Sequence, residues 1–198
     1  MDPTTAVITG LGLAGAAGLN AYVPLLVVGL LERADVIHLP SPYDQLSATP
    51  VLLVLGVLLA IEFLADKIPG VDSVNDVVQT VVRPAAGAVL MAGSLGIGTQ
   101  LPPWVGVLAG LITAGSIHAT KSVARPAINM STAGLGGPVV SAVEDAVALV
   151  ASLLAVLAPL LLVVFVAALV WVVARRVRRW RERRVALGVG DAPDAIGP

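Results

Sequence analysis

The chain alternates between long apolar segments and short polar ones. About twenty consecutive apolar residues cross a bilayer as a helix, and five segments reach or approach that length. They run from Thr5 to Leu31, from Val51 to about Ala65, from Pro84 to about Gly98, from Trp104 to about Thr120 and from about Val150 to Ala174. The pattern predicts an all-α integral membrane protein with about five transmembrane helices.

Two further segments have helical periodicity with a polar stripe. Val71 to Val82 places its polar residues on one helical face and fills the rest with valines. The run from Pro138 to Arg175 is too long for one crossing at about 1.5 Å per residue. We therefore expect one or two re-entrant or interfacial amphipathic helices. Alternatively, Pro138 to Ala158 is itself a full crossing, which would invert the spans before it.

Composition supports the membrane class. The chain is 57% hydrophobic and 13% charged, with a mean hydropathy of +0.94, whereas soluble domains carry about 25% charged residues. It contains no cysteine, which excludes disulfides and thiolate chemistry. The first residues lack the basic start of a signal peptide, so we expect a retained first helix.

Basic residues concentrate after the last apolar segment. Seven arginines lie between Arg175 and Arg184, close to Trp171 and Trp180. The positive-inside rule places this C-terminus in the cytoplasm, and the cell inner (cytoplasmic) membrane of a bacterium is the expected location. Five crossings would then put the N-terminus, Lys67 to Arg83 and Lys121 to Asp145 on the outer side. We expect anionic lipid headgroups, and no nucleic acid, to contact Arg175, Arg176, Arg178, Arg179 and Arg181.

These patterns divide the chain into a helical membrane domain at 1–174, an arginine-rich juxtamembrane helix at 175–187 and a disordered tail at 188–198. Small residues recur every four positions within three of the spans, which allows close helix packing and suggests a homo-oligomer. These ridges are Gly10, Ala14 and Gly18; Ala88, Ala92 and Gly96; and Gly106, Gly110 and Ala114.

An internal repeat relates two parts of the membrane domain. PGVDSVNDVV, from Pro69 to Val78, matches PVVSAVEDAV, from Pro138 to Val147, at half of the positions. The candidate repeats are 51–99 and 104–174. Copies of the same orientation predict a pseudo-two-fold axis along the membrane normal, with Asp76 and Asp145 facing each other.

Three motifs carry a family resemblance: GLNAYVPLL, ADKIPGVDSVNDVVQTVVRPAAGA and HATKSVARPAINMSTAGLGGPVVSAVEDAVAL. Together they resemble a family of uncharacterised bacterial multi-pass membrane proteins, catalogued as domain of unknown function forty-one twenty-six. The resemblance covers about Gly10 to Val170 and leaves the arginine-rich tail outside. It implies the membrane class and no particular activity.

Polar residues within the apolar body are the candidates for a substrate or ion site, because a charge in hydrocarbon costs at least ~2.5 kcal/mol unless it is paired or hydrated. They are Asn20, Asp66, Lys67, Asp72, Asp76, Arg83, His118, Lys121, Arg125, Asn129, Glu144 and Asp145. Helix starts at Pro69 and Pro138 would add unpaired N–H groups. Alternatively, the charges are structural ion pairs, such as Lys67 with Asp76 or Arg125 with Glu144. Likewise, Asn20 and His118 suit interhelical hydrogen bonds as well as ligand or proton-relay roles.

No motif supports an enzyme. The body has one histidine, short of a catalytic metal set, and the chain has neither a nucleophile elbow nor a nucleotide-binding loop. We expect no metal and no cofactor. The leading interpretation is a small transporter or channel for a small solute or ion, with its polar site between the repeated helix pairs. The alternative is an accessory or lipid-interacting membrane protein whose buried charges only fix helix packing.

Overall fold

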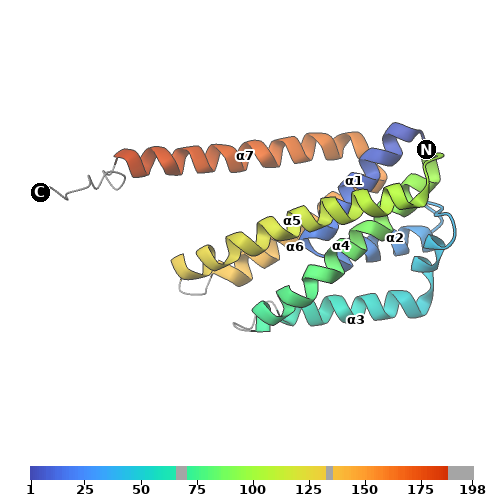
Figure 1. Ribbon diagram of the computed structural model, residues 1–198, viewed down its shortest axis with the longest axis horizontal. Coiled ribbons are helices and arrows are strands. Elements are labelled where there is room, and N and C mark those ends of the chain that lie inside the picture. Colours follow the sequence, from blue (N-terminus) through green and yellow to red (C-terminus); the bar gives the residue numbers. More distant parts are fainter. Residues whose placement is uncertain (66–70, 133–135, 187–198) are drawn as a thin grey trace, which may run out of the picture. The chain divides into compact units, whose positions relative to one another are not determined.

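The computed structural model describes residues 1–65, 71–132 and 136–186. Their regular secondary structure is helical (Figure 1) and consists of α1 (Pro3–Leu19), α2 (Tyr22–Arg33), the short 3-10 helix η1 (Tyr43–Ser47), α3 (Thr49–Ala65), α4 (Val71–Gly98), α5 (Pro103–Ser131), α6 (Gly136–Leu157) and α7 (Pro159–Ala186). The chain divides into two units, Met1–Leu162 and Val163–Pro198. The all-α prediction is confirmed for the described residues.

The first apolar segment forms two helices. The Asp2 carboxylate caps α1 by accepting a hydrogen bond from the Thr5 N–H at 3.0 Å. The helix ends at Leu19, Asn20 is extended, and α2 begins at Tyr22. Pro24 sits in the first turn of α2, where its missing N–H costs no helical hydrogen bond. Asn20 and Pro24 within this apolar segment predict a kink or a short break, and the structure has the break, so Thr5 to Leu31 does not form one continuous helix.

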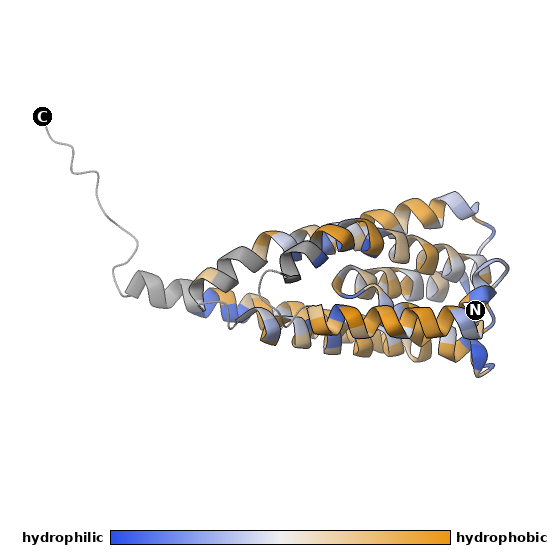
Figure 2. Ribbon diagram, turned by 90° about the horizontal axis from the view of Figure 1, so that it is seen from below, coloured by the Kyte–Doolittle hydropathy of each residue, from blue (hydrophilic) through white to orange (hydrophobic). Residues whose placement is uncertain are grey.

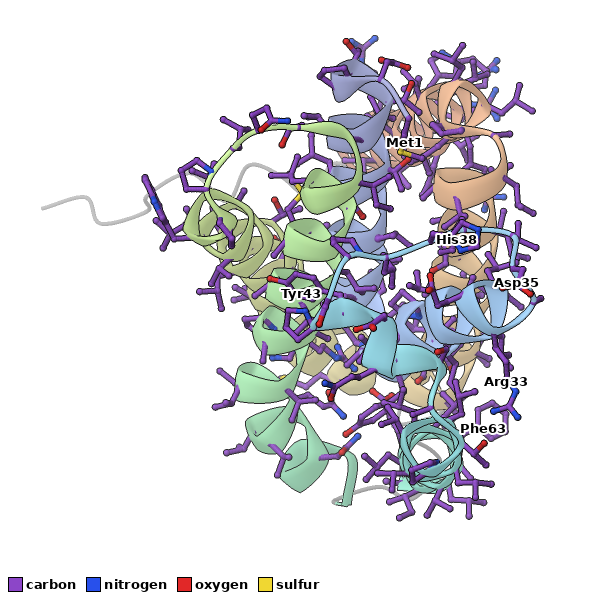
Figure 3. The ribbon with its side chains drawn as sticks, turned by 90° about the vertical axis from the view of Figure 1, so that its right-hand side faces the viewer. Met1, Arg33, Asp35, His38, Tyr43 and Phe63 are labelled. Carbon is purple, nitrogen blue, oxygen red and sulfur yellow. The ribbon has the colours of Figure 1, made fainter. Side chains whose placement is uncertain are left out.

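Both outer ends of the α1–α2 pair lie at one end of unit 1. A Cβ at Gly98, the last residue of α4, would lie 3.1 Å from the Met1 carbonyl oxygen. On the same end of α4, Gly96 abuts Pro40 and Gly93 abuts Tyr43, both in the connection after α2. The pair thus enters and leaves at the same end, which we call the Met1 end. Figure 3 looks at it directly, and hydrophilic residues gather there in Figure 2.

Four helices, α3 to α6, pack around this pair. α3 and α5 run away from the Met1 end, whereas α4 and α6 run toward it (Figure 1). α1 packs against α4, α5 and α6, and α2 packs against α3 and α6. Within the described residues, the two hairpins α3–α4 and α5–α6 therefore have the same direction, as a parallel repeat requires. The duplication itself stays a prediction.

Small residues make the closest helix contacts. α4 and α5 touch where the Gly87 backbone meets the Gly110 backbone, and Gly106 lies against Ala92. Gly10 of α1 faces the Met91 side chain. The ridges from which we considered a homo-oligomer are thus largely used inside the chain.

Two predicted boundaries differ from the structure. The amphipathic segment 71–82 is continuous with the third span, since α4 runs through Pro84 without ending. α6 continues to Leu157, and the division falls before Pro159 rather than near Val150. The polar residues of α6 do not need an aqueous interface, because Glu144 and Asp145 have partners inside the bundle. These partners allow the helix to continue without a break.

Three helical segments have the length and composition to cross a membrane: Val77–Gly98, Gly136–Leu157 and Pro159–Arg179. α1 and α3 are shorter apolar helices. Large apolar side chains such as Val54 and Val57 of α3 are more than half exposed, and long stretches of the helical ribbon are orange, that is hydrophobic, in Figure 2. Such a surface suits contact with hydrocarbon rather than water. The protein is a membrane-embedded helical protein.

The α4–α5 contact leads to a stability prediction. A Cβ at Gly110 would collide with the Gly87 carbonyl group, so Gly110→Ala must push the two helices apart. Overpacking of this kind costs ~1 to 3 kcal/mol, and thermal unfolding in detergent should occur at a lower temperature. Gly56→Ala is the matched control, because no atom lies within 4 Å of its added Cβ. Equal unfolding temperatures for the two variants would contradict the close packing.

Candidate functional site at the break between α1 and α2

The break between α1 and α2 is buried. Asn20 is 1% exposed, and it follows 17 helical residues that carry the chain about 25 Å inward from the Met1 end. Its side-chain oxygen accepts hydrogen bonds from the N–H groups of Tyr22 and Val23 at 2.9 and 3.0 Å. Its amide nitrogen donates to Asp145 Oδ1 at 2.9 Å. One side chain thus caps α2 and links the break to α6.

The other side of the break carries a buried cation. Lys121 of α5 is 7% exposed, and its ammonium donates to the Leu19 carbonyl oxygen at 3.2 Å. This oxygen belongs to the C-terminus of α1, where the helix dipole favours positive charge. The same ammonium lies 2.6 Å from Glu144 Oε2. α5 and α6 therefore place an ion pair directly against the end of α1.

A second ion pair lies in the same bundle. Arg83 of α4 donates to Glu62 Oε1 of α3 at 2.8 Å, and their side chains are 1% and 2% exposed. Removing two charges from water costs several kcal/mol per ion, which mutual attraction offsets only with good geometry and further hydrogen bonds. Burying this pair therefore carries a desolvation cost in free energy. The pair joins α3 to α4.

His118 of α5 extends this pair into a network. Its Nδ1 lies 3.2 Å from Arg83 Nη1, and its Nε2 lies 3.2 Å from Thr80 Oγ1. A guanidinium can only donate, so Nδ1 must accept and the imidazole must be neutral with its proton on Nε2. That proton is then directed at hydroxyl groups, Thr80 or Ser122. A proton added at Nδ1 would break the contact with Arg83.

Gln79 and Tyr22 connect the network to the break. The Tyr22 hydroxyl lies within hydrogen-bonding reach of the Gln79 side chain, and it is close enough to Glu62 and Arg83 to be affected by both charges. Gln79 Oε1 and Arg83 Nε are buried without a hydrogen-bond partner among the described residues. Buried unsatisfied polar atoms are costly and rare in native proteins. This acceptor and this donor, one turn apart on α4, could bind a small polar molecule such as water.

The structure brings half of the predicted site residues together around the break and the adjoining network. These are Asn20, Arg83, His118, Lys121, Glu144 and Asp145. Asp66 and Lys67 lie outside the described residues. Asp72 and Asp76 fall in α4, and Arg125 and Asn129 fall in α5, but their side chains also lie outside the described residues. The proposed facing of Asp76 and Asp145 is therefore not tested.

The predicted set of site residues leaves out four residues of the network: Tyr22, Glu62, Gln79 and Thr80. Glu62 carried a usable signal, since an acid within an apolar run is costly unless it has a partner. Gln79 and Thr80 precede Arg83 by four and three residues, so all three share a helix face. Tyr22 gave no such signal. For Glu144 we considered Arg125 as a partner, and the structure shows Lys121.

Among the described residues, no three His, Asp or Glu side chains gather into a possible metal site. In unit 2, the predicted lipid-contacting residues Arg175, Arg176, Arg178 and Arg179 are exposed on α7, and the Arg175 guanidinium lies 5.0 Å from the centre of the Trp171 ring. The Arg181 side chain lies outside the described residues.

The Glu62–Arg83 pair leads to a second prediction. Glu62→Leu or Arg83→Met alone leaves a buried charge without its partner, which costs ~3 to 5 kcal/mol, so each should lower the unfolding temperature in detergent strongly. The double variant Glu62→Leu/Arg83→Met removes both charges and should recover most of the loss. Arg33→Met, at an exposed arginine, is the control and should stay near wild type. Additive losses in the double variant would contradict direct pairing.

Comparison with curated proteins and with solved structures finds no match. A family defined by domain of unknown function 4126 matches residues 7–179. The match extends beyond the resemblance stated from the motifs, because it includes the first arginines of the C-terminal cluster. Since it covers most of the chain and no function is attached to it, the protein belongs to the DUF4126 family of unknown function.

Proposed function

We propose that this protein is a small transporter or channel for a small solute or ion, acting without enzymatic chemistry, and that its site lies at the α1–α2 break. The observation that carries the proposal is the helix break buried inside the bundle, with Asn20 at one helix end and Lys121 at the other. Discontinuous helices of this kind form the substrate and ion sites of many secondary transporters.

The cost of the break supports a functional role. Ending one helix and starting another leaves up to four C=O and four N–H groups without helical partners. In a membrane each unsatisfied group costs several kcal/mol, so non-helical backbone is tolerated where protein or a water-filled cavity surrounds it. A protein that needed only a packed core could use one continuous helix. The break between α1 and α2 instead offers a polar solute the dipoles of two helix ends and the charged side chains beside them.

The proposed topology has five crossings, α3 to α7, with α1–α2 as a re-entrant pair. With the C-terminal arginines in the cytoplasm, the Met1 end is outside, where Arg33 is the last residue of α2. The connections after α3 and α5 then lie on the cytoplasmic side, near Lys67 and Arg125, as the positive-inside rule favours. The sequence pattern predicts these segments on the outer side, because there α1–α2 counts as a crossing. The proposed location is the bacterial cytoplasmic membrane.

Cysteine labelling tests this topology, because the native chain contains no cysteine. Single cysteines at Ser41, Ser73 and Ser131 should react differently with an impermeant maleimide on intact cells. Ser41, at the Met1 end, should be labelled, whereas Ser73 and Ser131 should need permeabilised cells. Labelling of Ser73 and Ser131 from opposite sides would reject the parallel hairpins.

The same assay tests the arginine cluster. Anionic headgroups attract each nearby basic residue by ~1 kcal/mol, so Arg175, Arg176, Arg178, Arg179 and Arg181 should anchor and orient the chain. Changing these five to Gln should produce a mixed labelling pattern at Ser41. An unchanged, uniform pattern would show that the cluster does not orient the protein.

A second candidate function is an accessory or lipid-interacting subunit whose buried charges fix helix packing. The direct Glu62–Arg83 and Lys121–Glu144 pairs favour it, because each charge is met by protein rather than by a hydrated cavity. Under this alternative the charges contribute only to geometry, so an apolar replacement that preserves the fold should preserve function.

The double variant Glu62→Leu/Arg83→Met separates the two functions. A strain lacking the gene is compared with its parent by profiling small solutes inside and outside the cell. It is then complemented with wild type, with the double variant and with the Arg33→Met control. If the protein is a transporter, the double variant should fold and fail to restore the solute profile. Full restoration by the double variant would show that the Glu62–Arg83 pair only fixes helix packing, as the accessory function expects.

A further inference from the structure

Two polar side-chain atoms of α4 lie inside the bundle with unused hydrogen-bonding capacity. Gln79 and Arg83 are each 1% exposed, and neither Gln79 Oε1 nor Arg83 Nε has a hydrogen-bond partner among the described residues. A buried polar atom without a partner is costly and rare in native proteins. A bound molecule that satisfies both atoms would remove this cost.

The two atoms belong to one face of α4. Residues four positions apart in a helix are neighbours, with Cβ atoms about 5 to 6 Å apart, and one small molecule can bridge that spacing. Gln79 also lies within hydrogen-bonding reach of the hydroxyl group of Tyr22, the first residue of α2. A molecule bound by Gln79 and Arg83 would therefore lie next to the α1–α2 break, where we place the transport site.

The two atoms require opposite hydrogen-bonding roles from their ligand. Gln79 Oε1 can only accept a hydrogen bond, and Arg83 Nε can only donate one. The ligand must therefore donate one hydrogen bond and accept another. Water, a hydroxyl group or an amide does both, whereas an ammonium-type cation offers no acceptor and a simple anion offers no donor.

The charges of the network favour an uncharged ligand. The Arg83 guanidinium is already paired with Glu62 at 2.8 Å, and the His118 imidazole beside it is neutral. The charges of these three described residues therefore balance. An ion would add a net charge to a buried site, which is costly.

We propose that Gln79 Oε1 and Arg83 Nε together bind one small uncharged molecule that both donates and accepts a hydrogen bond. Solvent water and a dissolved amide or alcohol share this chemistry. The inference names the solute class of the proposed transporter and rests on that function, although the binding site can also be tested without transport.

Three planar compounds of nearly equal shape test the solute class. Urea is uncharged and both donates and accepts, guanidinium is a cation that only donates, and nitrate is an anion that only accepts. Initial uptake of each labelled compound is measured in proteoliposomes and in empty liposomes, with the membrane potential held at zero. Water permeability is measured separately from osmotic shrinkage in sucrose. Faster passage of urea identifies a solute site, and faster passage of water alone identifies a water site; neither ion should pass.

Gln79→Met tests the position, because methionine keeps the length of the side chain and removes the acceptor. It should slow the protein-dependent passage by about fivefold or more, as expected for the loss of one hydrogen bond. Gln45→Met makes the same change at an exposed residue of η1 and should leave the rate unchanged. Thermal unfolding in detergent checks that each variant folds. Should Gln79→Met not fold, Arg83→Lys keeps the charge, removes the Nε donor and should give the same loss.

Passage of guanidinium or nitrate at the rate of urea, or a wild-type rate in Gln79→Met, would overturn the inference. Passage of ions alone would leave transport standing with an ionic solute. If no compound passes, transport fails, and a high-resolution structure decides the site by itself. A molecule bound within hydrogen-bonding distance of Gln79 Oε1 and Arg83 Nε would keep the assignment, whereas no molecule there would remove it.

Discussion

The fold depends on satisfying a helix break inside an apolar bundle. Between Leu19 and Tyr22 the backbone leaves the helix, and water is not available in hydrocarbon to complete its hydrogen bonds. Asn20 caps the start of α2, and Lys121 binds the last carbonyl of α1. Each of these two side chains also has a partner on α6: Asn20 donates a hydrogen bond to Asp145, and Lys121 forms an ion pair with Glu144. The positions of α5 and α6 are thereby tied to the break.

The packing follows from the same constraint. α1 must be surrounded closely for its polar end to stay protected, and small residues on α1, α4 and α5 allow their backbones to approach. The Glu62–Arg83 pair and His118 lie next to this layer and tie α3 to α4 and α5. Because the guanidinium forces the neutral form of His118, the three residues behave as one unit. A substitution of any one of the three would therefore alter the hydrogen bonds of the other two.

Every charge described near the break contributes to the fold, and the same charges supply the helix ends with polar partners. Gln79 Oε1 and Arg83 Nε differ, since they are buried without a hydrogen-bond partner among the described residues. They mark the place where the network has capacity for a further polar molecule.

By itself the sequence determined the membrane class, the helical elements and the polar residues worth locating. These features depend on local composition: apolar length predicts a span, and Asn20, Arg83, His118, Lys121, Glu144 and Asp145 stand out against an apolar background. The family was also evident, because its motifs are contiguous. The sequence did not determine which charges pair, since Lys121 lies between His118 and Arg125 and either neighbouring turn could have faced Glu144.

Only the tertiary structure decided that the first segment turns back at Asn20 and that α6 continues to Leu157. Both results depend on residues far away in the sequence. The break is tolerated because Lys121 and Asp145 provide hydrogen-bond partners there, and α6 can continue because its acidic residues have partners in the bundle. Composition cannot report contacts between residues more than a hundred positions apart, such as Leu19 with Lys121 or Asn20 with Asp145. Counting apolar segments from hydropathy therefore gave the right class, but it did not predict that α1 and α2 begin and end at the same end of the bundle.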